Sequence, residues 1–241
     1  MQLPILYQDD DLVIVNKPSG LLVHRTLIDR HETRFAMQMV RDRIGQSVYT
    51  VHRLDKPTSG ALVFALSAGV ASQLSAQFEA GVVSKVYMAI VRGTPPEYSP
   101  VDYALSEEVD MKIGLAGSDK PAQSAQTEVF CLASQELPFT VDRYPTARYS
   151  LVKAVPKTGR RHQIRRHLRH LGHPIIGDIT YGVGKHNRFF ETHFKTRRLF
   201  LAATEIAFSH PRTGQLLKVK APLAENFLHV AGQLGWGSHL V

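Results

Sequence analysis

The chain has 241 residues, of which 44% are hydrophobic, so it is long enough and apolar enough for a large domain with a buried core. Lysine and arginine total 29 against 21 acidic residues, and the net charge of +8 favours a polyanionic partner. The single cysteine, Cys131, excludes an intrachain disulfide, and no apolar run approaches the ~20 residues of a membrane span. We therefore expect a cytoplasmic protein that does not enter a membrane.

The N-terminal part of the sequence predicts short strands joined by turns. Residues 5–15 read as two strands around an acidic turn, and the NKPSG segment that follows places Lys17 on a loop. Apolar runs at residues 48–51 and 61–66 predict two more strands. The sequence HRLDKPTSG, residues 52–60, is the connection between them, and its proline and glycines indicate a constrained loop.

The next segment predicts a helix and then a strand. Ser67 can cap a helix that ends at Gly81 and whose apolar residues recur every four positions. Residues 83–91 alternate as a strand, with Tyr87 on one face. The proline-rich segment TPPEYSP, residues 94–100, is the expected connection between two halves of the chain.

The C-terminal half contains the strongest helix signal. Residues 106–126 lack a clear period and predict irregular structure or a weak hairpin, whereas residues 149–155 predict a strand. The segment KTGRRHQIRRHLRHLGHP then predicts a helix that Thr158 can cap and that a glycine and a proline stop. From residue 199 onward, the sequence predicts two strands around the turn HPRTG and a short helix near residues 224–234.

Asp55 and Tyr87 are candidates for chemistry only in the right surroundings. A fully exposed carboxylate is solvated and unreactive, whereas burial raises the pKa of a carboxylate by ~3 to 5 units, so a buried one needs a cation to stay ionised. On the loop alone, a capping or surface-paired aspartate is the more ordinary interpretation of Asp55. Tyr87 is most simply a packing residue unless its face points at Asp55.

The arginines of the predicted helix suggest what the partner is. Arg161, Arg165 and Arg169 recur at four-residue steps and form a cationic stripe beside an apolar one. An ordinary solvent-exposed helix face would show the same spacing of charged residues. Like charges at this spacing, however, repel one another unless anions compensate. RNA phosphates, or one buried carboxylate together with phosphates, would compensate them.

Two other chemistries find no support in the sequence. The histidines of the same segment lack the spacing of an HExxH metal site, no acidic residue accompanies them, and the neighbouring arginines would repel a dication. GVGKHN, residues 182–187, lacks the glycine spacing and the GK[ST] ending of a P-loop. We therefore expect neither a metal site nor a nucleotide cofactor.

Four motifs follow one another along the chain. NKPSGLLVH spans residues 16–24, HRLD followed by PTSG begins at His52, KxYxAxVRG spans residues 85–93, and TGRRHQIRRHLRHLGHPIIGDITYG spans residues 158–182. In content and order they resemble the motifs of RluA-type RNA pseudouridine synthases. The resemblance extends over almost the whole chain, which makes it far more specific than any one motif.

The resemblance implies an α+β fold. We expect a mixed, mainly antiparallel curved sheet in two halves, flanked by helices, with the catalytic cleft between the halves. One catalytic domain would cover residues 1–241, with its halves joined near residues 94–100, and no small RNA-binding domain of the S4 type would precede it.

The resemblance also implies a reaction and residues for it. Uracil would be detached from its ribose, rotated and rejoined through carbon 5, without a cofactor. Asp55 matches the essential aspartate, Tyr87 the tyrosine under the target base, and Arg165 the ionic partner of the aspartate, for which we expect a bidentate pairing. Arg53 matches the arginine that fills the stack when the base flips out. Further RNA contacts are expected at His52, Lys17, Arg160, Arg161, Gln163, Arg166 and Arg169.

The substrate remains more open than the reaction. The segments KPSGLLVHRT, RYPTARYSLV and QLGWG resemble family members that act on tRNA, which implies uridine 65 of the T-stem as the target. Ribosomal RNA as substrate, an RNA-binding module without chemistry, and a hydrolase that releases uracil are the alternatives. We expect a monomer that needs no protein partner. One departure is Ala202, where relatives carry a histidine, and it puts local packing or an RNA contact in doubt.

Overall fold

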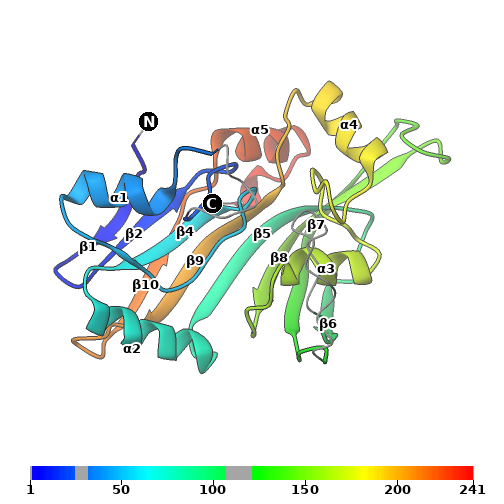
Figure 1. Cartoon of the computed structure of the whole chain (residues 1–241). Helices are drawn as coiled ribbons and strands as arrows, with labels where there is room; N and C mark the ends of the chain where they lie inside the picture. Colours follow the sequence, from blue (N-terminus) through cyan, green and yellow to red (C-terminus); the bar gives the residue numbers. More distant parts are fainter. Residues whose placement is uncertain (1, 25–31, 107–120, 241) are drawn as a thin grey trace.

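The computed structural model describes residues 2–24, 32–106 and 121–240, and its helices pack around one extended sheet (Figure 1). In chain order the elements are β1 (Ile5–Gln8), β2 (Leu12–Lys17), α1 (Ala36–Ile44), β3 (Tyr49–Thr50), β4 (Ser59–Ala65), α2 (Ala68–Glu79), β5 (Ser84–Arg92), β6 (Tyr98–Asp102), β7 (Gln126–Leu137), β8 (Ala147–Pro156), α3 (Gln163–His170), α4 (Gly184–His193), β9 (Leu201–Ser209), β10 (Leu216–Lys220), α5 (Glu225–Gln233) and the 3-10 helix η2 (Gly237–His239). No helix in the described ranges has the length and apolar character needed to cross a bilayer.

The sheet is mixed and mainly antiparallel, which confirms the expected fold class. Its strands follow the order β1-β2-β4-β9-β5-β8-β7-β6, with β10 beside β9 and β3 beside β4. Only the short contact between β4 and β9 is parallel among the ladders of the described strands. Strands from both ends of the sequence therefore meet in the middle of one sheet.

The sheet opens along one side of β5. Residues 84–89 of β5 pair with β9, whereas β8 pairs only with residues 87–92. On the β8 side of this opening, Val155 and Pro156 pair with β7 and no longer with β5. Tyr87 thus lies at the point where β5 and β8 separate, with α2 on one side of this region and α3 on the other (Figure 1).

The core extends over both faces of the N-terminal strands. Val13 of β2 packs in one cluster with Val40 of α1, and the next strand residue, Ile14, packs in another cluster with Leu74 of α2. This strand is buried on both faces, as its continuous apolar sequence requires. Tyr87 packs against the α1 cluster and also against the cluster of the C-terminal half, so its ring lies between the two.

Several sequence predictions are confirmed by these elements. The two N-terminal strands, strand β5 and the hairpin of β9 and β10 lie where they were expected. Helix α2 begins as predicted, because the hydroxyl of Ser67 accepts a hydrogen bond from the backbone N–H of Val70. The final helix, α5, also matches.

Other predictions were wrong in register or missed an element. Lys17 is the last residue of β2 rather than part of a loop. Helix α3 begins only at Gln163, because the hydroxyl of Thr158 donates to the Gln163 side chain instead of capping the helix. Strand β6 begins at Tyr98, inside the expected connection. Helices α1 and α4 and strand β7 were not predicted, and most of the segment 106–126 lies outside the described residues.

Gly60 tests the contact between β4 and β9. Its φ of 117° is unfavourable for a residue with a side chain, and a Cβ there would lie 2.1 Å from the carbonyl oxygen of Ala203. Gly60→Ala should lower the free energy of unfolding by more than about 2 kcal/mol in denaturant titrations. Gly69→Ala, in open space on α2, is the control and should leave stability unchanged or slightly raised. Equal effects of the two variants would contradict the tight contact.

Candidate active site

Asp55 lies on the loop between β3 and β4, and the N-terminal segment holds this loop in place. The carbonyl oxygen of Lys56 accepts hydrogen bonds from the backbone N–H of Gly20, at 2.8 Å, and from Nζ of Lys17, at 3.1 Å. The hydroxyl of Ser19 donates to the carbonyl of the following proline, at 2.7 Å. The position of Asp55 is thus fixed by contacts to the backbone of the two residues that follow it.

Lys17 fixes the Asp55 loop from inside the protein. Its side chain is fully buried, and Nζ donates to the carbonyl oxygens of Pro18, Leu21 and Lys56 at 3.0, 2.8 and 3.1 Å. Burial lowers the pKa of Lys17 to about 7, although nearby Asp55 acts in the opposite direction. The expected phosphate contact at Lys17 is therefore wrong, because this ammonium group does not reach the surface.

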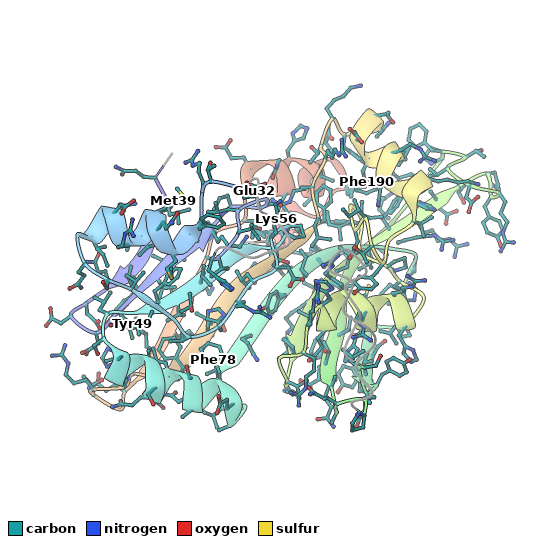
Figure 2. All side chains as sticks on the ribbon, in the orientation of Figure 1. Glu32, Met39, Tyr49, Lys56, Phe78 and Phe190 are labelled. Atoms are coloured by element: carbon teal, nitrogen blue, oxygen red, sulfur yellow. The ribbon has the colours of Figure 1, made fainter. Side chains whose placement is uncertain are left out.

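His52 supports the same loop from within the protein. Its Nε2 accepts a hydrogen bond from the backbone N–H of Val63 at 3.0 Å, and its ring stacks on Phe78 with the centroids 4.6 Å apart. Figure 2 labels Phe78 on α2 and Lys56 nearer the centre of the molecule. Burial lowers the pKa of His52 to about 3, so the ring is neutral at physiological pH. The RNA contact predicted at His52 would therefore be made by an uncharged ring.

Arg165 of α3 connects two carboxylates. Its NH1 donates to Oδ2 of Asp55 at 3.2 Å, which brings together residues 110 positions apart in the chain. Its Nε and NH2 donate to the two oxygens of Asp178 at 2.7 and 2.9 Å. The expected bidentate pairing with Asp55 is therefore wrong, because the guanidinium presents its fork to Asp178 and leaves a single donor for Asp55.

The pair of Arg165 and Asp178 is buried and strongly charged. The side chain of Arg165 is 4% exposed and that of Asp178 only 1%. Burial alone lowers the pKa of Arg165, but the hydrogen bonds and charge of Asp178 outweigh it and raise that pKa overall. For Asp178, burial alone raises the pKa, but the hydrogen bonds and charge of Arg165 outweigh this effect and lower the pKa overall. The backbone N–H groups of Thr180 and Tyr181 also donate to Asp178.

Tyr87 and Lys85 line a cleft of about 1020 Å³ together with Asp55 and Arg165. Burial raises the pKa of Tyr87, and the Asp55 charge adds to the effect, so the side chain is a neutral phenol. Burial lowers the pKa of Lys85, whose Nζ lies 3.4 Å from the carbonyl oxygen of Thr158 across the opening. The cleft therefore combines a carboxylate, a phenol and cations.

The other predicted RNA contacts lie in three settings. Arg53, Arg160 and Arg161 are exposed and line the cleft. Arg166 and Arg169 lie on α3 beyond it. Gln163 lines the cleft but is buried, and its amide is fully used within the protein: the oxygen accepts from Thr158 and from a backbone N–H, and the nitrogen donates to Gln126 and Thr127. The expected RNA contact at Gln163 is therefore wrong, since its amide supports the loop before α3.

Ala202, the departure from the motif of relatives, lies inside the sheet. It pairs with Ser59 of β4 and with Met88 of β5, and its side chain is 2% exposed. The residue therefore affects packing and cannot contact RNA.

Three residues of the site were not predicted. Asp178 is the only acidic residue of its motif, and this charge imbalance beside so many arginines could have singled it out. Lys85 begins the motif of residues 85–93, but the sequence assigned it no role. His162 was considered only as a metal ligand, yet its Nε2 lies 3.9 Å from Oδ1 of Asp55.

A possible cation site lies elsewhere in the described ranges. Oxygens of Asp9 and Asp11 and a ring nitrogen of His210 come together there. Arg212 already pairs with one carboxylate of this group, because its Nε lies 2.6 Å from Oδ2 of Asp11. The cluster is not part of the cleft lining.

Residues 11–170 match the family described as RNA pseudouridylate synthase. The chain belongs to this family. It is 51% identical to tRNA pseudouridine synthase C of Vibrio cholerae serotype O1, over 99% of this chain and 98% of that protein. It is 50% identical to the protein of the same name from Pasteurella multocida, over 98% of both chains.

Solved structures of family members have the same fold. Human RNA Pseudouridylate Synthase Domain Containing 4 is 26% identical, with a TM-score of 0.72 over 96% of this chain and 93% of that one. Human RNA Pseudouridylate Synthase Domain Containing 1 is also 26% identical, with a TM-score of 0.71 over 92% of this chain and 84% of that one. The fold that surrounds the Asp55 cleft is therefore the fold of the pseudouridine synthase family.

Lys17→Met tests the clamp on the Asp55 loop. The variant keeps an apolar stem but loses three hydrogen bonds, so the loop should shift and kcat should fall by about 100-fold with little change in RNA affinity. Steady-state kinetics and a binding titration with RNA separate the two effects. Lys218→Met, at an exposed ion pair on β10, is the control and should behave as the wild type. Weaker RNA binding with an unchanged kcat would contradict this role and would indicate that Lys17 contacts an RNA phosphate.

Asp178→Asn tests the pairing of Asp178 with Arg165 through its pH dependence. The folded-state pKa of Asp178 is lowered, so its stabilisation is present above the unfolded value of about 3.9 and is lost as pH falls through the folded value. The wild type should exceed the variant in free energy of unfolding at pH 6, and the difference should shrink toward pH 2. Asp142→Asn, at an exposed pair with Lys185, should show a small difference throughout. A constant gap for Asp178→Asn would contradict the pairing.

Proposed function

We propose that this chain converts uridine 65 in the T-stem of tRNA into pseudouridine. The proposal is carried by one observation: over nearly its full length, the chain is about 50% identical in sequence to relatives named tRNA pseudouridine synthase C. The cleft supports it, because Asp55 lies there beside a cation and a tyrosine. The position of the target follows from the resemblance of the sequence details to tRNA-modifying family members.

The reaction is a rearrangement within one nucleotide. The bond between C1′ and N1 breaks, a bond between C1′ and C5 forms, a proton leaves C5 and a proton is gained at N1. No group passes to another molecule and no electrons are gained or lost overall, so the protein needs no cofactor. We further propose that the chain acts as a cytoplasmic monomer without a protein partner.

Asp55 is the group that acts on the nucleoside in this proposal. Arg165 holds Oδ2 of Asp55, which leaves Oδ1 directed to the substrate, and the guanidinium stabilises the carboxylate charge while the nucleoside excludes water. Tyr87 offers a neutral aromatic ring on which the extruded uracil can stack. These are the three residues to which the resemblance of the motifs assigns the reaction.

RNA binding rests on the basic rim of the cleft. A uridine inside a stem must be extruded, at a cost of a few kcal/mol, and the exposed guanidinium of Arg53 can stack in the gap and offset part of it. Phosphate contacts come from the arginines at the rim and on α3, which are Arg160, Arg161, Arg166 and Arg169. Affinity should therefore fall steeply as the salt concentration rises.

The proposal is tested by tritium release from tRNA transcript labelled at carbon 5 of uracil. Wild-type protein should release tritium, and Asp55→Asn should lower the rate by more than about 1000-fold while RNA binding persists. Asp102→Asn, at an exposed carboxylate on β6 outside the cleft, is the matched control and should keep the wild-type rate.

Each other outcome contradicts a defined part of the proposal. Release from ribosomal RNA but not from tRNA would keep the reaction and overturn the substrate. Free uracil in the medium would indicate a hydrolase. No release from either RNA, with salt-sensitive binding intact, would indicate an RNA-binding module without chemistry. Mapping of the modified nucleotide tests uridine 65.

A further inference from the structure

Lys85 is a cation of the cleft to which the sequence assigns no role. It lies on the part of β5 that pairs with β9 but not with β8, next to the opening of the sheet (Figure 1). Residues two apart on a strand share a face, so Lys85 is on the same face of β5 as Tyr87, about 7 Å away along the strand. Both side chains line the cleft. Lys85 is therefore next to the ring on which the target base is proposed to stack.

The ammonium group of Lys85 lacks a counter-charge. Three lysines of the described residues line the cleft, and two of them, Lys56 and Lys157, each form an ion pair with a glutamate. Lys85 forms no ion pair with a described carboxylate, and its Nζ donates one long hydrogen bond, of 3.4 Å, to the carbonyl oxygen of Thr158. Lys17, by contrast, uses all three donors within the protein. Two donors of Lys85 are therefore available for a ligand.

The surroundings of Lys85 make its charge unfavourable in the absence of an anion. The side chain is half-buried, burial lowers its pKa, and no neighbouring carboxylate reverses the effect. Burial is also the main cause of the low pKa of His52, and the Lys85 charge adds to it, so the ammonium group lies near this ring at the start of the Asp55 loop. A desolvated cation without a partner in the protein is stabilised when a ligand supplies the negative charge.

We propose that Lys85 binds one of the two phosphates that flank the target uridine. A nucleoside whose base stacks on Tyr87 and whose sugar faces Asp55 carries both phosphates on that same sugar, which brings them to the side of the cleft where Lys85 lies. The ion pair supplies the missing counter-charge and holds the extruded nucleotide by its backbone. The inference rests on the proposed function, because it requires that a uridine enter the cleft.

The salt dependence of RNA affinity measures the contact. Lys85→Met keeps an apolar stem but removes the charge, and it should raise the dissociation constant of unmodified tRNA by about tenfold, the value of one charged hydrogen bond. The slope of log affinity against log salt concentration should become smaller by about one, because one phosphate fewer is neutralised. Lys218→Met, at the exposed ion pair on β10, is the control and should keep the wild-type slope. An unchanged slope for Lys85→Met would overturn the contact.

Substrates that lack one phosphate charge locate the contact. Two tRNAs are assembled by ligation, each with a neutral methylphosphonate on one side of the target uridine. One of them should bind the wild type about tenfold more weakly than natural tRNA does. Lys85→Met should bind that tRNA as well as it binds natural tRNA, because both changes remove the same ion pair. Losses that multiply for both tRNAs would contradict a flanking phosphate as the partner of Lys85.

Stability and activity separate the possible failures. Lys85→Met should leave the free energy of unfolding unchanged or raised in denaturant titrations, because it removes a half-buried charge without a counter-charge. A lower free energy of unfolding with an unchanged salt slope would instead give Lys85 a structural role, through its bond to Thr158, and would overturn the inference. If the wild type does not modify tRNA, the proposed function fails. If it modifies tRNA and Lys85→Met keeps the wild-type slope, only the inference about Lys85 fails.

Discussion

The buried guanidinium of Arg165 is the group on which the rest of the site depends. An arginine that is 4% exposed must be paired, and this one is shared between Asp178, with two hydrogen bonds, and Asp55, with one. The bidentate bond fixes the plane of the guanidinium, so its third donor points at Asp55 before any substrate arrives. The carboxylate of Asp55 thus has a counter-charge that is built into the protein.

The two carboxylates reach Arg165 from different parts of the fold. Asp55 is on a loop that Lys17 and the NKPSG segment hold by backbone carbonyls, whereas Asp178 is in a turn that follows α3. The separation of β5 and β8 at Tyr87 leaves the space between these parts. The site therefore depends on how strands from both ends of the sequence meet in one sheet, and a shift of either part would break the single bond between Arg165 and Asp55 first.

The sequence motifs predicted the members of the site better than their contacts. Asp55, Tyr87 and Arg165 were recognised by residue type and order, and the structure places them in one cleft. Asp178 was missed as the bidentate partner because the direction of a guanidinium is set by tertiary packing, which spacing along the chain does not encode. Lys17 was assigned to the surface because a charge pattern does not distinguish an exposed lysine from one that binds three buried carbonyls.

The most direct test of this account is a crystal structure of Asp55→Asn bound to the T-arm of tRNA. We expect one uridine to be extruded, with its base against Tyr87 and its sugar facing residue 55, while Arg165 keeps both bonds to Asp178. A helix whose uridines all remain stacked over an empty cleft, or an RNA bound on another face of the protein, would contradict it.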